Sequence, residues 1–164
     1  MPSLDPTFRK LDGPVTDHFD CGENDQNKFL RESAWPDQKQ GWSVTYLAYV
    51  KGMLAGYVAL SNDALELTKR ERPIDAPYGR IGAVKIVQLG VDRRFQGQGL
   101  GEMLLDFAVL YARHASEASG CRYVTLDSVA SRVAYYTKRG FRINDEAHAK
   151  KIRRSKDKDP ALSR

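Results

Sequence analysis

The chain has 164 residues, a net charge of +5 and 41% hydrophobic residues, so it can form one domain with one core and is not a disordered chain. No stretch approaches the roughly 20 apolar residues of a membrane span, and the polar first ten residues are no signal peptide, so we expect a cytoplasmic protein. Two cysteines, Cys21 and Cys121, cannot form a disulfide scaffold or a zinc site. The histidines show no ligand spacing either, so we expect no metal.

The positive charge is concentrated at the C-terminal end. Residues 147–164 carry a net charge of +5, so residues 1–146 sum to zero. We therefore divide the chain into a single domain at 1–146 and a basic tail at 147–164. A solvated terminus explains such a tail, and so does an arm that contacts RNA phosphates or an acidic partner. Charge alone leaves both explanations open.

The first half of the chain predicts a helix followed by a β-hairpin. The helix is expected over 22–31 and its continuation, with Asn24 or Asp25 as its N-terminal cap. Residues that favour β-structure are concentrated in two runs, 43–50 and 53–60. Because only a two-residue turn with a glycine separates these runs, we expect them to pair as a hairpin.

The rest of the chain alternates helices and strands. Helices are expected at 64–70, 99–118 and 131–139, and strands at 84–91, 123–126 and 141–144. The helix at 99–118 has the clearest pattern, because apolar residues recur along it at helical spacing. Strands interleaved with helices indicate an α/β or α+β fold with a mixed sheet.

A basic, glycine-spaced turn at 88–102 (QLGVDRRFQGQGLGE) joins a predicted strand to the long predicted helix. Gly97, Gly99 and Gly101 let backbone N–H groups approach an anion, and the dipole of the helix adds to the attraction. An arginine of the turn can add a charge-assisted hydrogen bond. The turn lacks the Lys-Ser/Thr pair of a Walker A loop and the third glycine of a dinucleotide motif. It therefore favours a diphosphate in some other ligand.

Two motifs together resemble the GNAT acetyltransferases. Arg94-x-x-Gly97-x-Gly99 resembles motif A of that family, which binds the pyrophosphate of acetyl-CoA, and 134–141 (AYYTKRGF) resembles motif B. The resemblance implies a mixed central sheet with a splayed strand pair, helices on both faces and acetyl-CoA as co-substrate. The cofactor-binding residues that it implies are Leu89, Gly90, Val91, Arg94, Gln96, Gly97, Gln98, Gly99, Leu100 and Gly101.

Acetyl transfer to an amine needs a neutral amine, a stabilised oxyanion and a proton for the leaving thiolate. The resemblance implies a bulge at Gly90 that makes room for pantetheine, with backbone groups of Leu89 and Val91 near the thioester. It makes Tyr136 the general acid, because a phenol with a pKa of about 10 is protonated at neutral pH. The alternative is that Tyr136 is a core residue. By residue type alone, the candidates for a general base are Glu66, Glu102 and Asp127.

The N-terminal half narrows the resemblance to the GNAT toxins of type II toxin–antitoxin pairs. Segments 19–22 (FDCG), 27–30 (NKFL) and 56–61 (GYVALS) resemble motifs of that group. The resemblance implies acetylation of the α-amine of aminoacyl-tRNA, which stops translation, and implies a ribbon-helix-helix antitoxin and a homodimer as partners. The α-amine of an aminoacyl ester has a lowered pKa, so no general base is needed. A basic surface suits RNA, and its cations include Lys85, Arg93, Arg139, Arg142 and those of the tail.

Two features depart from the family pattern. Val129 stands where many relatives have an asparagine, and no strand signal follows residue 144. We therefore expect the last strand of the GNAT sheet to be absent or supplied by a partner. Two other functions stay open: a housekeeping GNAT enzyme that acetylates a small amine or a protein N-terminus, and a catalytically degenerate GNAT fold that binds a partner.

Overall fold

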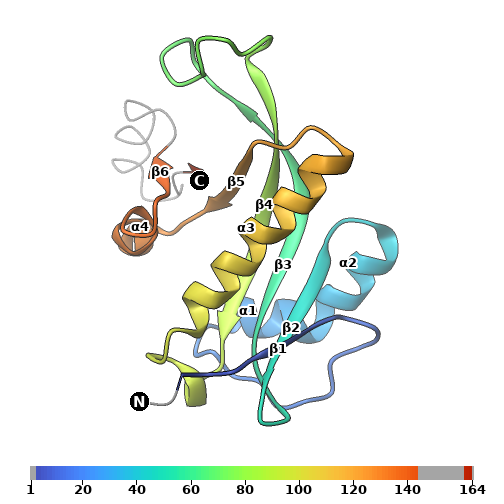
Figure 1. Cartoon of the computed structure of the whole chain (residues 1–164). Helices are drawn as coiled ribbons and strands as arrows, with labels where there is room; N and C mark the ends of the chain where they lie inside the picture. The colour runs from blue at the N-terminus through green and yellow to red at the C-terminus, as the bar shows by residue number, and fades with distance from the viewer. Residues whose placement is uncertain (1–2, 144–160, 164) are drawn as a thin grey trace. The chain divides into compact units, whose positions relative to one another are not determined.

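The computed structural model describes residues 3–143 and the backbone of 161–163 (Figure 1). The contacts divide the chain into two units, Met1–Ser61 with Ile86–Leu110 and Asn62–Lys85 with Tyr111–Arg164, and each is described by itself. Three long elements contribute residues to both units: β3 (Met53–Glu66), β4 (Arg80–Val91) and α3 (Leu100–Ala118). No helix of the described residues is long and apolar enough to cross a membrane.

In the first unit the strands follow the order β1–β2–β3–β4. β1 (Thr7–Lys10), which the sequence did not predict, pairs antiparallel with β2 (Val44–Val50). β2 pairs antiparallel with β3, and the turn residues Lys51 and Gly52 have φ angles of 50° and 77°. Two successive positive φ angles are typical of the type I′ turn, whose twist matches that of the flanking strands. The predicted hairpin is therefore confirmed.

The first helical segment begins at Asn24 and continues beyond residue 31, as the sequence predicted. α1 (Asn24–Lys28), a π-helical turn (Phe29–Ser33) and α2 (Ala34–Gln40) follow one another without a break. The prediction that Asn24 or Asp25 caps this helix is wrong, because Glu23 holds the N-cap position and no side chain makes a capping hydrogen bond there. Gly41 ends α2 in the left-handed conformation, with φ of 79°.

Helices cover both faces of the strands in this unit. Tyr57 of β3 is fully buried, donates a hydrogen bond to the carbonyl of Gln26 (2.8 Å) and stacks against Phe29. The neighbouring position is Gly56, where a Cβ would lie 3.1 Å from Leu104 of α3. Successive side chains of a strand point to opposite faces. The α1–α2 segment therefore packs on one face of these strands and α3 on the other.

In the second unit β3 continues past residue 60, and the short helix expected at 64–70 is wrong. Leu65 is buried while Ala64 and Glu66 on either side of it are not, which is the alternation of a strand. The amide of Leu67 donates to the carbonyl of Gly79 (2.9 Å). Pairing with a neighbouring segment has therefore overridden the local helix preference of this sequence.

A short last strand corrects the expectation that the sheet lacks one. β7 (Ala161–Ser163) pairs antiparallel with both β5 (Tyr123–Asp127) and β6 (Arg142–Ile143), so the order in this unit is β3–β4–β5–β7–β6. Three residues after a charge-rich stretch show no alternating pattern, so this strand could not be predicted from the sequence. The rest of the predicted tail, up to residue 160, lies outside the described residues. The expected mixed α/β fold is confirmed.

Candidate functional site

The glycine-spaced turn connects β4 to α3. A 3-10 turn (Arg93–Phe95) follows β4, and Gly97 and Gly99 then have φ angles of 73° and 87°. A Cβ at either glycine would meet no atom within 4 Å. The turn therefore requires glycine for its left-handed backbone and not for lack of space.

The backbone of this turn forms a group of hydrogen-bond donors. Within residues 3–143, the N–H groups of Gly97, Gln98 and Gly99 have no acceptor. The amides of Leu100 and Gly101 in the first turn of α3 have no partner within the helix either, as in any α-helix. These donors lie at the positive end of the dipole of a 19-residue helix. The arrangement suits a phosphate or diphosphate.

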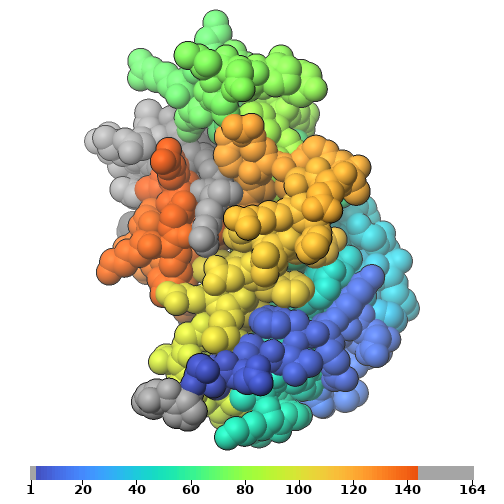
Figure 2. Space-filling view, viewed as in Figure 1, coloured from blue at the N-terminus to red at the C-terminus, as the bar shows by residue number. Residues whose placement is uncertain are grey.

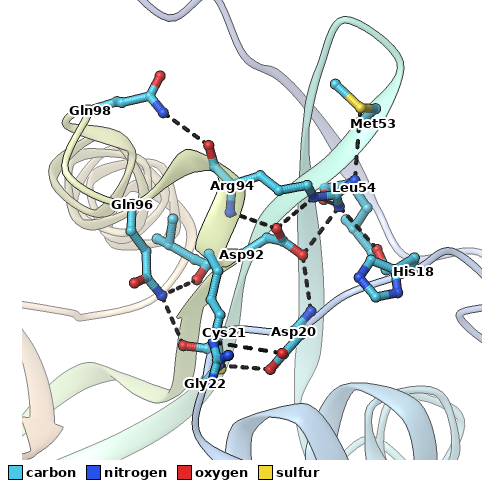
Figure 3. A network of polar contacts seen from close by, with 12 residues as sticks. His18, Asp20, Cys21, Gly22, Met53, Leu54, Asp92, Arg94, Gln96 and Gln98 are labelled. Atoms are coloured by element: carbon cyan, nitrogen blue, oxygen red, sulfur yellow. Dashed lines mark hydrogen bonds and ion pairs between the residues drawn. The ribbon is translucent and has the colours of Figure 1, made fainter.

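A buried carboxylate anchors the turn (Figure 3). Asp92 is 1% exposed, and its Oδ1 accepts hydrogen bonds from the backbone N–H (3.0 Å) and Nε (2.7 Å) of Arg94. Its Oδ2 accepts from the backbone N–H of Asp20 (2.9 Å) and from a terminal guanidinium nitrogen of Arg94 (3.2 Å). Burial raises the pKa of Asp92, but these hydrogen bonds and the charge of Arg94 outweigh burial, so its pKa lies below the ordinary value.

The guanidinium of Arg94 is engaged by the protein itself. Besides its bonds to Asp92, one terminal nitrogen donates to the carbonyls of Leu54 (3.3 Å) and His18 (3.4 Å). The hydrogen bond to Asp92 raises the pKa of Arg94, which keeps it charged. Arg94 therefore ties the turn to β3 and to the N-terminal segment. The neighbouring Arg93 has a side chain that is 66% exposed and lies 3.6 Å from Asp20.

The N-terminal segment 18–27 is bound to the turn through a set of polar contacts. Gln96 donates from Nε2 to the carbonyls of Cys21 (2.8 Å) and Val91 (2.9 Å), and the amide of Arg93 donates to the carbonyl of Asp20 (2.9 Å). Hydrogen bonds from Asn27 and the Gly22 amide lower the pKa of the Asp20 carboxyl. These contacts give a physical reason for the FDCG segment and for Asn27, because both hold the N-terminal segment beside the turn. From the sequence, the segment and the turn were connected only by the family resemblance.

The residues predicted to flank the thioester lie on β4. Gly90 is buried, and a Cβ there would lie 2.8 Å from the ring of Tyr57 and 3.2 Å from that of Phe19. Close packing against two aromatic rings therefore requires glycine at this position. Leu89 and Val91 on either side of it are half-buried. The bulge that we expected at Gly90 stays a prediction.

Tyr136 lies in the second unit, on α4 (Val133–Thr137). Its ring packs edge-on against Tyr135 (5.1 Å between ring centres) and Phe141 (5.8 Å). Burial raises the pKa of the Tyr136 phenol above its ordinary value, so the hydroxyl is protonated at neutral pH. The side chain is half-buried, which leaves part of its surface accessible.

Two of the three carboxylates considered as general bases are paired in the second unit. Asp127 lies 2.7 Å from the ammonium of Lys85, and Glu66 lies 3.9 Å from Arg80. Burial raises the pKa of the Cys121 thiol, which disfavours its nucleophilic thiolate. Among the residues that the structure describes, no three His, Cys, Asp or Glu side chains are grouped to hold a metal ion.

These features combine a mixed α/β fold with a group of backbone hydrogen-bond donors at the start of its long helix. The family model described as an acetyltransferase (GNAT) domain matches residues 41–143, which include the glycine-spaced turn and α4. The chain therefore belongs to the GNAT acetyltransferase family.

Several known proteins are similar to this chain over most of its length. A tRNA-acetylating toxin of Mycobacterium tuberculosis is 28% identical over 133 residues, which is 77% of each protein. The solved structure of AtaT complexed with acetyl-methionyl-tRNAfMet has a TM-score of 0.80 at 22% identity and covers 98% of this chain and 94% of that one. A tyrosine-to-phenylalanine mutant of the AtaT toxin, bound to the C-terminus of the antitoxin AtaR and acetyl-CoA, has a TM-score of 0.74 at 23% identity and covers 98% and 92%. At these identities the two structures establish the fold.

Replacing Asp92 by Asn should destabilise the first unit by about 1–3 kcal/mol at pH 7, because Arg94 loses a buried charged acceptor. The half-exposed guanidinium favours the lower part of this range, since solvent screens it. The pKa of Asp92 is lowered in the folded state, so its contribution is present above the unfolded-state pKa of about 3.9 and is lost as the pH falls through the folded-state pKa. Urea unfolding of both proteins from pH 7 down to about pH 2 measures this difference.

The control is the exposed carboxylate Asp12, whose replacement by Asn should leave stability nearly unchanged. A stability difference between Asp92→Asn and the unaltered protein that stays constant from pH 7 to about pH 2 would show that the carboxylate charge is not what anchors the turn.

Proposed function

We propose that this chain transfers the acetyl group of acetyl-CoA to the α-amine of an aminoacyl-tRNA, and that it acts as a toxin by stopping translation. One observation carries the proposal: the relationship to a tRNA-acetylating toxin extends over 77% of both proteins. It is supported by the N-terminal segment, which resembles a motif of the toxins and is hydrogen-bonded to the glycine-spaced turn through Asp20, Cys21 and Gln96.

The turn binds the pyrophosphate of acetyl-CoA chiefly through its backbone. The N–H groups from Gln96 to Gly101, together with the N-terminus of α3, surround the phosphate oxygens. Arg94 serves as the anchor of the turn, whereas the exposed Arg93 supplies the nearby positive charge. Backbone groups of Leu89 and Val91, on either side of Gly90, hold the pantetheine and face the thioester.

Tyr136 is the general acid. The neutral amine attacks the carbonyl carbon of the thioester, a C–N bond forms, and the C–S bond breaks as its electron pair goes to sulfur. The nitrogen carries an extra proton once the C–N bond has formed, and it releases that proton to solvent. The Tyr136 hydroxyl donates its proton to the leaving thiolate and is then reprotonated by solvent. Its raised pKa supports this role because the phenol stays protonated between turnovers.

No side chain of the protein acts as a general base on the acceptor amine. The α-amine of an aminoacyl ester has a lowered pKa, so much of it is neutral near pH 7. The ion pairs of Asp127 and Glu66 support this assignment, because they occupy two carboxylates that could otherwise act as bases.

We propose two protein partners, a ribbon-helix-helix antitoxin and a second copy of the chain. The antitoxin is supported by the AtaT complex with the C-terminus of AtaR. The division into a domain at 1–146 and a basic tail also stays a proposal, although β7 shows that the last residues of the tail pair with the sheet. The expected absence of a last strand had favoured a degenerate binding protein, and β7 supplies that strand.

Labelled acetyl-CoA, incubated with the chain and either a mixed pool of charged tRNA or a panel of free amines, tests the acceptor. Label on charged tRNA, and none on deacylated tRNA, is the expected result. Label only on free amines would support a housekeeping enzyme, and no label on any acceptor would contradict acetyl transfer.

Replacing Tyr136 by Phe should lower kcat by about 10²–10⁴-fold while the dissociation constant for acetyl-CoA stays the same, because only the proton donor is removed. Steady-state kinetics and calorimetric titration with acetyl-CoA measure the two quantities. Tyr78→Phe, on a tyrosine that is 68% exposed in another segment, is the control and should change neither. Equal kcat values for Tyr136→Phe and the unaltered chain would refute the general acid.

Replacing Gly99 by Ala should weaken acetyl-CoA binding about tenfold or more, because alanine disfavours the positive φ that aims the amides of the turn. Gly52→Ala is a matched control: its φ of 77° is similarly left-handed and its Cβ would also meet no atom within 4 Å. It should lose similar stability and keep its affinity for acetyl-CoA. The same affinity in both variants would contradict anion binding by this backbone.

A further inference from the structure

The segment around α4 is rich in cations. Residues 129–143 contain four cations and neither Asp nor Glu: Arg132, Lys138, Arg139 and Arg142. Three of these side chains are exposed and Arg139 is half-buried. The end of this segment, red-orange in Figure 2, is visible on the molecular surface. Such a segment attracts polyanions.

One of the cations is fixed in place against an aromatic ring. The guanidinium of Arg139 lies 3.5 Å from the centre of the Tyr135 ring, and its NH1 donates to the Tyr135 carbonyl (2.8 Å). The Tyr135 side chain is nevertheless 37% exposed, a large value for an aromatic residue. The ring and the guanidinium thus form a partly accessible stacked pair on α4.

The stacked pair adjoins the residue assigned as the general acid. Tyr135 directly precedes Tyr136, and their rings meet edge to face at 5.1 Å. A group bound on Tyr135 or Arg139 therefore lies close to Tyr136, since Tyr135 precedes it on α4 and Arg139 follows two residues after the end of that helix.

Single-stranded RNA combines the two chemistries that this segment offers. Its unstacked bases bind on aromatic rings and on arginine planes, and its phosphates bind cations. An acidic peptide would use the cations alone and gives no reason for an exposed tyrosine ring. A role confined to stabilising α4 accounts for the pair but not for the exposed cations around it.

We propose that the Tyr135–Arg139 pair binds a base of the single-stranded 3′ end of the acceptor RNA, while Arg132, Lys138 and Arg142 contact its phosphates. This inference rests on the proposed function, because the aminoacyl group is attached to the 3′-terminal nucleotide. Stacking of that end on α4 brings the amine to Tyr136 and makes the pair a positioning device for the acceptor.

Binding of deacylated tRNA, measured by fluorescence anisotropy, tests the pair without any chemistry. One probe ends in the unpaired CCA nucleotides, and a second probe is the same tRNA without them. Tyr135→Leu and Arg139→Ala should each weaken binding of the CCA-ended probe about tenfold and leave binding of the truncated probe unchanged. Tyr135→Phe keeps the ring and should bind as the unaltered chain does.

Two further variants separate stacking from charge. Arg139→Lys keeps the charge but not the plane, so it should lose most of the CCA-dependent affinity. Lys138→Ala should weaken both probes and reduce the slope of log affinity against log salt by about 0.7–0.9. Arg113→Ala, which removes an exposed cation on α3, should change neither affinity. Thermal unfolding of every variant identifies any that fail to fold.

Acetylation kinetics provide the second readout. Tyr135→Leu should raise KM for aminoacyl-tRNA about tenfold with little change in kcat or in affinity for acetyl-CoA. Folded Tyr135→Leu and Arg139→Lys proteins that bind the CCA-ended probe as tightly as the unaltered chain would overturn the inference, even where aminoacyl-tRNA is acetylated. Equal affinity of the unaltered chain for both probes would overturn it as well. If the chain acetylates no aminoacyl-tRNA but its CCA-dependent binding needs the pair, the proposed function fails and this inference stands.

Discussion

The candidate cofactor site depends on one buried carboxylate. Asp92 follows β4 and accepts hydrogen bonds from a residue of the turn and from the N-terminal segment, which lies more than 70 positions earlier in the chain. A buried charge is stable only when it is fully hydrogen-bonded, so the three parts are held together by a single requirement. The same requirement keeps the guanidinium of Arg94 at Asp92. We therefore propose that Arg94 acts chiefly as the anchor of the turn and that the backbone of the turn binds the anion.

In the proposed reaction, the protein binds acetyl-CoA chiefly through its backbone and the acceptor chiefly through side chains. On the acetyl-CoA side, specificity comes from backbone conformation, because positive φ angles at Gly97 and Gly99 orient the amide donors. Such a site needs few particular side chains beyond its glycines and its anchor. On the acceptor side, the proposal rests on side chains in and just after α4, where the Tyr135 ring contacts both the Tyr136 ring and the guanidinium of Arg139.

Much of the fold could be predicted because local patterns determine it. The hairpin at Lys51-Gly52, the long helix α3 and the glycine-spaced turn all follow from short stretches of sequence. The extension of β3 and the strand β7 could not be predicted, because each depends on pairing with a distant segment. For the same reason the residue types of the site could be predicted from the sequence, whereas the Asp92 anchor could not, because its partners Asp20 and Arg94 are far apart in the chain. From the sequence alone, Arg93 and Arg94 are equally good candidates for a phosphate contact, because both lie beside the glycine turn. The hydrogen bonds of the structure distinguish them, because they hold the guanidinium of Arg94 at Asp92.

The central claim is that the acetyl group goes to the α-amine of an amino acid esterified to tRNA. The most direct measurement is mass spectrometry of the product: charged tRNA is incubated with the chain and acetyl-CoA, and the ester is then hydrolysed to release the amino acid. We expect the released amino acid to be N-acetylated and the nucleotides to be unchanged. An acetyl group on a nucleotide, or an unmodified amino acid from a preparation that acetylates other amines, would contradict it.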